Sequence, residues 1–393
     1  MTLGRVRHCA RAVAVAACSA VYSTESVPQS PASPPPGALR AGYASLAAEF
    51  ERVTSIRELR DGRVLVAGAG YLPLAVGDFR SREVEPVGRE GDGPGEYREV
   101  TRIHALGGDS TLVEDRRRLR WIILDGSRAV ATLATWAQGA RGPTVAAVDG
   151  RGRVLELRAS RYGEAAGVPV MQYAANAESL LVLIHRDVIA AMSGRAARSE
   201  PDTVARLRGR FRGLRVARRG TYRDAPLFFE LHNPLGVEEQ AMLFPDGWLA
   251  LALFDPYRVD WITPEGRRLA GRPLPFTPTI VDDRQMRHAI VMWGPGGRQS
   301  VFGPTDFPNW PDNLPPFHND ALVAAPDGRL LIQRTSNALE PFTLYDIVDR
   351  AGELNGRLKL AANERIIGFG VRSVYVLVIT DDDTQRLRRH PWP

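Results

Sequence analysis

Residues 87–97 read VGREGDGPGEY, and this stretch indicates how the chain is built. Four glycines and one proline within eleven residues do not fit a helix interior or a central strand. The stretch is therefore a tightly specified loop between regular elements. Glycine loops that hold phosphates lead into a helix, whereas this one leads into a predicted strand. We interpret it as the connection between two structural repeats.

Asp-Gly turns at four places, each followed by a short apolar run, predict a series of β-hairpins. They lie at residues 61–62, 149–150, 246–247 and 327–328. Glycine accepts the positive φ that such turns require. The runs that follow are too short for helices and are typical of buried strands. They read VLVA from residue 64, VLEL from 154, LALAL from 249 and LLIQ from 330.

A second repeated motif strengthens the evidence for repeats. Residues 119–126 read LRWIILDG and residues 259–266 read VDWITPEG, so Trp121 and Trp261 each precede a turn glycine by five residues. A looser copy, LYDIVDRAG, spans residues 344–352. Antiparallel strands that recur every few tens of residues without intervening helices are typical of an all-β repeat fold, and four strands per unit favour a β-propeller.

The pattern divides into six units, of which the last is incomplete. It has too few strands at the C-terminus and needs residues 44–53 as its missing strand, which would close the ring and remove its exposed edges. We therefore predict a six-bladed β-propeller over residues 41–393, closed by pairing of the N- and C-terminal segments. The units span residues 54–88, 98–133, 143–209 (with an insertion at 161–177), 226–275, 314–360 and 365–390.

The N-terminus predicts export. Residues 1–22 combine arginines with a short apolar run, and Val15-Ala16-Ala17-Cys18 resembles a lipobox whose Cys18 is lipidated after cleavage. Residues 23–40 are rich in serine and proline and predict a tether. We expect a periplasmic, exported or membrane-anchored protein. The alternatives are cleavage without lipidation, a misplaced start codon, or an unstructured tail on a cytoplasmic protein.

Composition narrows the function classes. With 44% hydrophobic and 24% charged residues, the 393-residue chain has the composition of a globular protein. Its two cysteines are Cys9 and Cys18, so the rest folds without a disulfide or a thiolate metal site. Lys359 is the only lysine, and the chain has no P-loop, G-x-S-x-G, H-E-x-x-H or C-x-x-C motif. These absences exclude only enzymes that such motifs define.

With the units in place, the chain resembles six-bladed β-propellers of the NHL-like group, in particular a bacterial branch of exported and lipoprotein-type propellers. Proteins of that branch carry a G-x-x-G-x-G-P-G-E-aromatic loop after the first blade, which here runs from Gly88 to Tyr97. The weak third unit departs from the pattern. The resemblance implies a fold and a location outside the cytoplasm, and it implies no particular reaction.

Candidate ligand-binding residues precede or enter two of the units. The oxygens of these candidate residues, together with Glu230, could hold a calcium ion near the channel. The alternative is that the candidate residues cap turns by hydrogen bonding to backbone groups. A predicted helix at residues 282–293, capped by Asp282 or Asp283, leads into an aromatic Pro/Gly-rich loop that is either functional or covers a blade edge. The candidates are His232, Asn233, His318, Asn319, Asp320 and, in that loop, Trp310.

Two charged stretches have competing interpretations. Asp92 and Glu96 could bind a cation or a basic partner, or Glu96 could satisfy backbone N–H groups of the glycine turn. Residues 206–219 hold seven arginines and no acid, which suits an anionic membrane surface or a solvated outer strand. Phe211 is the only aromatic residue among them, so we do not expect a nucleic-acid partner.

We therefore expect a binding or scaffold propeller with a protein or small-molecule ligand on one face. The missing catalytic motifs and the repeat architecture favour this hypothesis over an enzyme. The alternative is a propeller hydrolase or lyase, similar to lactonases, that uses a calcium ion in the channel. For that alternative, Asn233 and Asp320 should converge near the axis.

Overall fold

The structure is a computed structural model, and all residues that it describes belong to one unit, Ser33–Pro393. The predicted signal, Cys18 and most of the tether lie outside the described residues, which are 36–40, 42–134, 145–159, 163–165, 168–170, 179–186, 188–194, 200–210, 214–222, 225–294, 300–307, 309–340 and 342–392.

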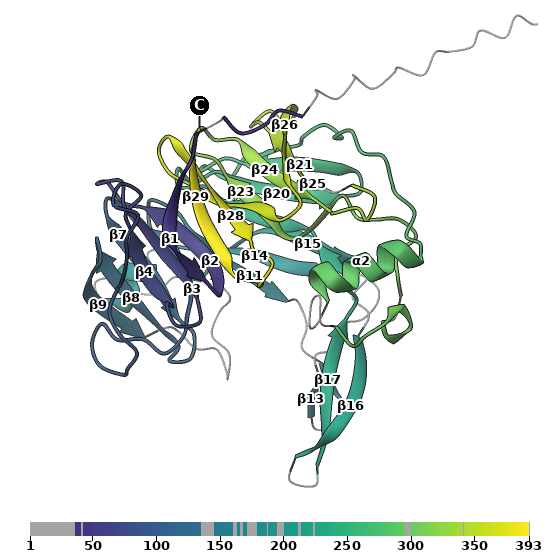
Figure 1. Cartoon of the computed structure of the whole chain (residues 1–393), viewed down its shortest axis with the longest axis horizontal. Coiled ribbons are helices and arrows are strands. Elements are labelled where there is room, and N and C mark those ends of the chain that lie inside the picture. Colours follow the sequence, from purple (N-terminus) through teal and green to yellow (C-terminus); the bar gives the residue numbers. More distant parts are fainter. Residues whose placement is uncertain are drawn as a thin grey trace, which may run out of the picture. The chain divides into compact units, whose positions relative to one another are not determined.

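The described residues form six antiparallel sheets of four or five strands, arranged as a six-bladed β-propeller (Figure 1). The prediction of the fold class is confirmed. In each blade the first strand contacts the first strand of the next blade, and β27 of the sixth blade contacts β2 of the first. These first strands therefore form a closed inner ring around the channel.

The first three blades follow the chain from β2 to β18, listed here from the inner to the outer edge. Blade one has β2 (Arg52–Glu58), β3 (Val64–Ala69), β4 (Leu74–Gly77) and β5 (Val84–Pro86). Blade two has β6 (Val100–Ala105), β7 (Ser110–Asp115), β8 (Arg120–Asp125) and β9 (Arg128–Ala134). Blade three has β10 (Val145–Val148), β11 (Val154–Ala159), β14 (Ser179–His185), β15 (Asp202–Arg210) and β18 (Val237–Glu238).

The last three blades run from β19 to the C-terminus, in the same order. Blade four has β19 (Gln240–Leu243), β20 (Leu249–Phe254), β21 (Tyr257–Ile262) and β22 (Arg268–Leu269). Blade five has β23 (Phe317–Ala324), β24 (Leu330–Arg334), β25 (Phe342–Val348) and β26 (Leu354–Ala361). Blade six has β27 (Glu364–Phe369), β28 (Ser373–Ile379), β29 (Gln385–Pro391) and β1 (Ala44–Phe50).

The N-terminal strand completes the sixth blade, as predicted. β1 pairs antiparallel with β29, with Ala44 opposite Arg389 and Phe50 opposite Gln385 (Figure 1, purple beside yellow). Leu46 of this strand is buried, and it packs with residues of the first and sixth blades. The sixth sheet thus has β27 at its inner edge and β1 at its outer edge, and β1 leads directly into blade one.

The repeated residues occupy equivalent places in the blades. Trp121 and Trp261, both on third strands, are 2% and 0% exposed. Gly62, Gly247 and Gly328 have φ between 85° and 91°, as the Asp-Gly turns require. The turn of blade three is displaced from the prediction by two residues: its positive φ is at Gly152, whose N–H bonds the Asp149 carbonyl.

Two segments depart from the predicted blade limits. The insertion in blade three forms a small hairpin, β12 (Gly163–Ala165) with β13 (Val168–Val170), and β11 pairs directly with β14 across it. The predicted start of blade four near residue 226 was wrong. Residues there belong to a second hairpin, β16 (Leu214–Tyr222) with β17 (Ala225–His232), and blade four begins at β19.

Helices are few among the described residues. They are α1 (Val188–Met192), α2 (Asp283–Trp293) and the 3-10 turn η2 (Pro304–Asp306). The predicted helix is confirmed as α2, and Asp282 caps it by accepting from the Gln285 N–H at 2.9 Å. In the described part of the chain, no helix is long and apolar enough to cross a membrane.

Candidate functional site

A cavity of about 550 Å³ lies where blades five and six meet the segment that contains α2. Its volume falls within the usual size of small-molecule sites, ~300–1,000 Å³. The lining comes from β23, the β24–β25 loop, the first residues of β27 and the end of α2. Because β23 and β27 are inner strands, the cavity lies on the face where the inner strands begin.

Helix α2 is held against blade five by side-chain hydrogen bonds. Gln285, which is 2% exposed, donates to Asn337 Oδ1 at 2.7 Å and accepts from the Ala338 N–H at 3.0 Å. His288 Nε2 lies 2.7 Å from the Ser336 hydroxyl. These contacts fix α2 over the β24–β25 loop, so that one wall of the cavity is preformed.

The aromatic loop after α2 forms a small core with that helix. Trp310 donates from Nε1 to the Pro304 carbonyl at 2.9 Å and meets Phe307 edge-to-face at 5.9 Å. Phe302, Phe307 and Trp310 pack around Ile290 of α2. Trp310, a predicted ligand-binding residue, is therefore part of the packing beneath α2 and is not among the residues that line the cavity.

A bulge in β23 presents three of the predicted residues. The register with β24 shifts between Phe317 and Leu322, and Asp320 adopts a φ of 58°. The bulge frees backbone groups of β23 that would otherwise bond to a neighbouring strand. Gln240 satisfies two of them, by donating to the His318 carbonyl at 2.6 Å and accepting from the Ala321 N–H at 3.0 Å.

His318 lines the cavity and is held on both sides. Its Nε2 donates to the Pro234 carbonyl at 2.9 Å, and its ring stacks on Trp293 with centroids 4.2 Å apart and planes 11° from parallel. Burial lowers the pKa of His318 from its usual value, although the hydrogen bonds to Pro234 and Asn319 oppose this effect. The neutral ring therefore serves as a planar wall at neutral pH.

The two predicted groups of residues meet, but mostly through backbone groups. Asn319 accepts from the Glu238 N–H at 3.0 Å and donates to the Gly236 carbonyl at 3.3 Å. Asn233 is 2% exposed and accepts from the Leu235 N–H at 2.8 Å, as the turn interpretation expected. His232 ends β17 instead of preceding an inner strand, and its side chain lies outside the described residues.

Asp320 reaches the channel. Its side chain is 86% exposed and pairs at 3.3 Å with Arg102 of β6. Blades two and five are opposite members of a six-membered ring, so this ion pair spans the channel. Asn233 does not join it there. Across the described residues, no three His, Cys, Asp or Glu side chains are grouped so that they could hold a metal ion.

Buried charges form the base of the cavity. Asp346 is fully buried and accepts from Arg334 at 2.9 Å, Arg357 at 2.8 Å and the Tyr257 hydroxyl at 2.9 Å. Arg334 also lies over the Phe276 ring at 4.7 Å. A buried charge is tolerated when it is paired and hydrogen-bonded, so this network fixes both arginines in place.

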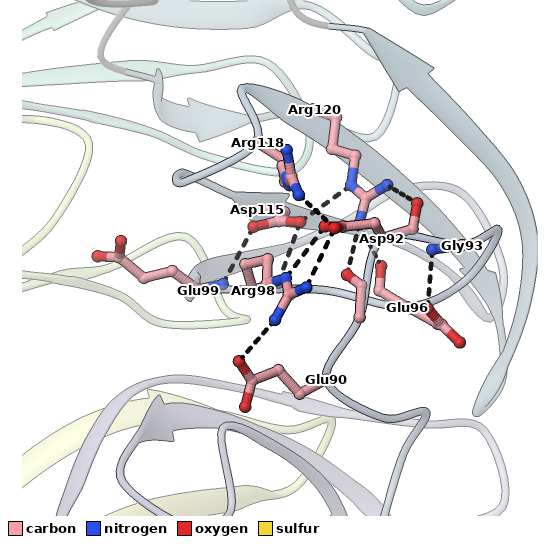
Figure 2. Close-up of polar contacts among 10 residues, drawn as sticks. Glu90, Asp92, Gly93, Glu96, Arg98, Glu99, Asp115, Arg118 and Arg120 are labelled. Atoms are coloured by element: carbon pink, nitrogen blue, oxygen red, sulfur yellow. Dashed lines mark hydrogen bonds and ion pairs between the residues drawn. The ribbon is translucent and has the colours of Figure 1, made fainter.

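The glycine-rich loop is a closed polar network that joins blades one and two (Figure 2). Glu96 accepts from the Gly93 N–H at 2.7 Å and from Arg89 at 2.7 Å. Asp92 pairs with Arg98 at 3.0 Å and with Arg118. Hydrogen bonds from Arg98 and Arg118 hold the pKa of Asp92 well below its usual range. Glu96 thus satisfies the glycine turn, as one of the two interpretations expected.

Arg120 ties this loop to blade two. Its guanidinium donates to the backbone carbonyls of Gly91, Asp92 and Glu96 at 3.2, 3.1 and 2.8 Å, and pairs with the buried Asp115 at 2.9 Å (Figure 2). The loop carboxylates already have arginine partners. The loop is therefore a structural connection, and a cation site at Asp92 and Glu96 finds no support in this geometry.

The arginine-rich segment at residues 206–219 is only partly described. Arg206 and Arg208 lie on β15, the fourth strand of blade three, which is followed only by the two-residue β18. Arg208 pairs at 3.2 Å with Glu239, which is 3% exposed. At least one of these arginines thus has a structural role. The side chains of residues 210–219 lie outside the described set.

Comparisons with known proteins support no family assignment. No protein-family model matches this chain, and no curated protein matches its sequence. The chain is similar in structure to a member of the DUF4221 family from Bacteroides vulgatus, with 8% identity and a TM-score of 0.44 over 88% of this chain and 95% of that one.

Two further solved structures are similar at the same level. A Bacteroides fragilis protein named as a candidate exported protein shares 10% identity, with a TM-score of 0.47 over 90% of this chain and 95% of that one. A streptogramin B lyase shares 10% identity, with a TM-score of 0.36 over 90% of this chain and 87% of that one. Similarity at this level carries no argument about activity or ligands.

Sequence reasoning missed most of the cavity. Trp293, Thr335 and Arg365 line it from three separate elements, and none of them stands in a local motif. The predicted helix that ends at Trp293 was the one available signal. Where that helix would lie was beyond the sequence, because its contacts are with a loop some fifty residues further along the chain.

Proposed function

We propose that this protein is a ligand-binding propeller that acts outside the cytoplasm and takes a small molecule in the cavity at blades five and six. The carrying observation is the cavity itself, about 550 Å³ in volume, with a wall fixed by α2 and a base fixed by Asp346. Concave, preformed sites that combine apolar rings with a few polar groups are the usual form of small-molecule sites.

The proposal also covers the location of the protein and the family to which it belongs. The lipobox-like sequence at Cys18 and the tether support a lipid-anchored protein, and labelling with a lipid precursor tests this. The glycine-rich loop supports membership of the NHL-like exported propellers through its sequence. A protein ligand on the same face remains a further proposal, without a surface assigned to it.

An enzymatic role is the second candidate function. The observation in its favour is that the Asp320 side chain lies in the channel and is 86% exposed, so that a cation which displaced Arg102 would reach its carboxylate. Calcium prefers such oxygen ligands. Reproducible turnover of lactones, sugars or peptides that depends on calcium and on Asp320 would favour this candidate over binding alone.

The test of the binding proposal is a screen of defined small molecules by thermal shift, repeated on a variant with a filled cavity. Thr343 lines the cavity, so Thr343→Trp should abolish the stabilisation by every cavity ligand. The matched control is Thr132→Trp, on the exposed β9, which should leave it unchanged. Ligands that stabilise the Thr343 variant as strongly as the parent protein would contradict the proposal.

A further inference from the structure

Arg365 is a charged residue in the cavity without a counter-charge of its own. It belongs to β27, the inner strand of blade six, where its neighbour Ile366 is buried in the core between blades five and six. Arg365 lines the cavity and is half-buried.

The guanidinium of Arg365 forms no ion pair and no hydrogen bond with the described residues, and its Nε is buried without a partner. Burial lowers the pKa of Arg365, although the nearby Asp320 opposes this effect. An arginine remains protonated in proteins, so the charge persists. A buried charge without a partner is costly, which makes this site receptive to an anion.

The other arginines of the cavity already have carboxylate partners. Arg334 and Arg357 share Asp346, Glu364 pairs with Arg388 at 2.9 Å, and the Asp320 carboxylate pairs with Arg102. Arg334 and Arg357 together keep one surplus positive charge, which the exposed Glu340 carboxylate at the rim offsets, and Arg365 adds one cation without a partner among the described residues. A phosphate monoester, with a charge of about −1.5 to −2 at neutral pH, would exceed the single net positive charge that remains. A monoanion matches this balance.

The remaining lining indicates what the anion is attached to. The stacked Trp293 and His318 rings and the Phe276 ring provide planar, weakly polar surfaces. The Thr335 hydroxyl is also buried without a hydrogen-bond partner and lines the same cavity. Such a lining suits a flat apolar group together with one hydrogen-bonding group.

We propose that the cavity binds a small aromatic carboxylate, with its carboxylate on the guanidinium of Arg365 and its ring among the planar side chains. The fork of an arginine matches a carboxylate with two parallel hydrogen bonds, a geometry that a lysine does not offer. This inference rests on the proposed function, because it names the ligand class of the same cavity.

The experiment compares matched pairs of probes by calorimetric titration: benzoate with benzamide, and indole-3-acetate with indole-3-acetamide. In the parent protein the carboxylates should bind about 10-fold to 100-fold more tightly than their amides, as a charge-assisted pair requires. Arg365→Met keeps an unbranched stem and removes the guanidinium, so it should abolish this preference, mainly by weakening the binding of the carboxylates. Arg287→Met, on the exposed side of α2, is the matched control.

A stability measurement guards against a misfolded variant. Because Arg365 has no partner, Arg365→Met should keep or raise the melting temperature without ligand, whereas loss of a structural pair would lower it. Any of three results overturns the inference: acids and amides bind equally, the preference for acids survives in Arg365→Met, or no probe binds. Binding of amides and acids alike, lost in Thr343→Trp, would leave the proposed function standing while this inference falls.

Discussion

Replacing Asp115 with asparagine tests whether the glycine-rich loop is held by its buried ion pair. Asp115 is 1% exposed and accepts from Arg120 Nε at 2.9 Å and from the backbone N–H groups of Glu99 and Arg98 at 3.0 and 3.2 Å (Figure 2). The variant removes the counter-charge of Arg120, whose side chain is only 13% exposed. Arg120 in turn holds three carbonyls of the loop.

The magnitude follows from the burial of this pair. Removing one partner of a buried ion pair costs ~3–5 kcal/mol, because the other charge stays buried without compensation. Asparagine keeps one acceptor oxygen for a backbone N–H, so we expect the lower end, a loss of about 3 kcal/mol in the free energy of unfolding. The assay is urea unfolding. An unchanged dependence of the free energy of unfolding on urea concentration would show that the shift in midpoint reports stability.

The matched control is Asp92→Asn in the same loop. Asp92 also pairs with arginines, but its side chain is 47% exposed and its ion pairs are open to screening by salt. Its substitution should cost clearly less than that of Asp115, and the difference from the parent protein should shrink further at high salt. Equal losses in the two variants, or a loss below ~1 kcal/mol for Asp115→Asn, would refute the reasoning.

Two further predictions concern ring closure and the cavity wall. Leu46→Ala in β1 should lower the free energy of unfolding by ~2–5 kcal/mol, because Leu46 is 2% exposed in the core that closes the ring; the exposed Ala47→Ser should change it by less than ~0.5 kcal/mol. Since the pKa of His318 is lowered in the fold, the unfolded state binds more protons near its ordinary pKa of about 6.5. Stability should therefore be full above this pH and fall below it, more steeply in the parent protein than in His318→Gln.

The readouts differ for these two predictions. Urea unfolding measures the first, and a loss for Leu46→Ala no larger than for the control would contradict it. Unfolding midpoints between pH 5 and pH 8 measure the second. His288 has a lowered pKa as well, also from burial, so the parent and the variant must be compared at each pH. Parallel pH profiles would contradict the assignment to His318.

The sequence determined the architecture because each blade is specified by local patterns. Apolar strands, turn glycines such as Gly62 and the equivalent tryptophans Trp121 and Trp261 recur within short distances along the chain. Even the missing strand of blade six followed from the sequence, since a ring with an open edge needs a partner for it. Helix α2 was predictable from its cap at Asp282 for the same local reason.

The site depended on contacts between distant parts of the chain. Arg365 has no feature in the sequence that separates it from the other arginines, and its lack of a partner appears only once Asp346, Asp320 and Glu364 are seen to pair elsewhere. Likewise, His318 meets Trp293 only because a bulge in β23 lies beside the end of α2. The sequence alone determined the blades and their closure, whereas only the tertiary structure decided which charges are paired, because pairing depends on the distance between side chains from different strands and, for Asp320 and Arg102, from opposite blades.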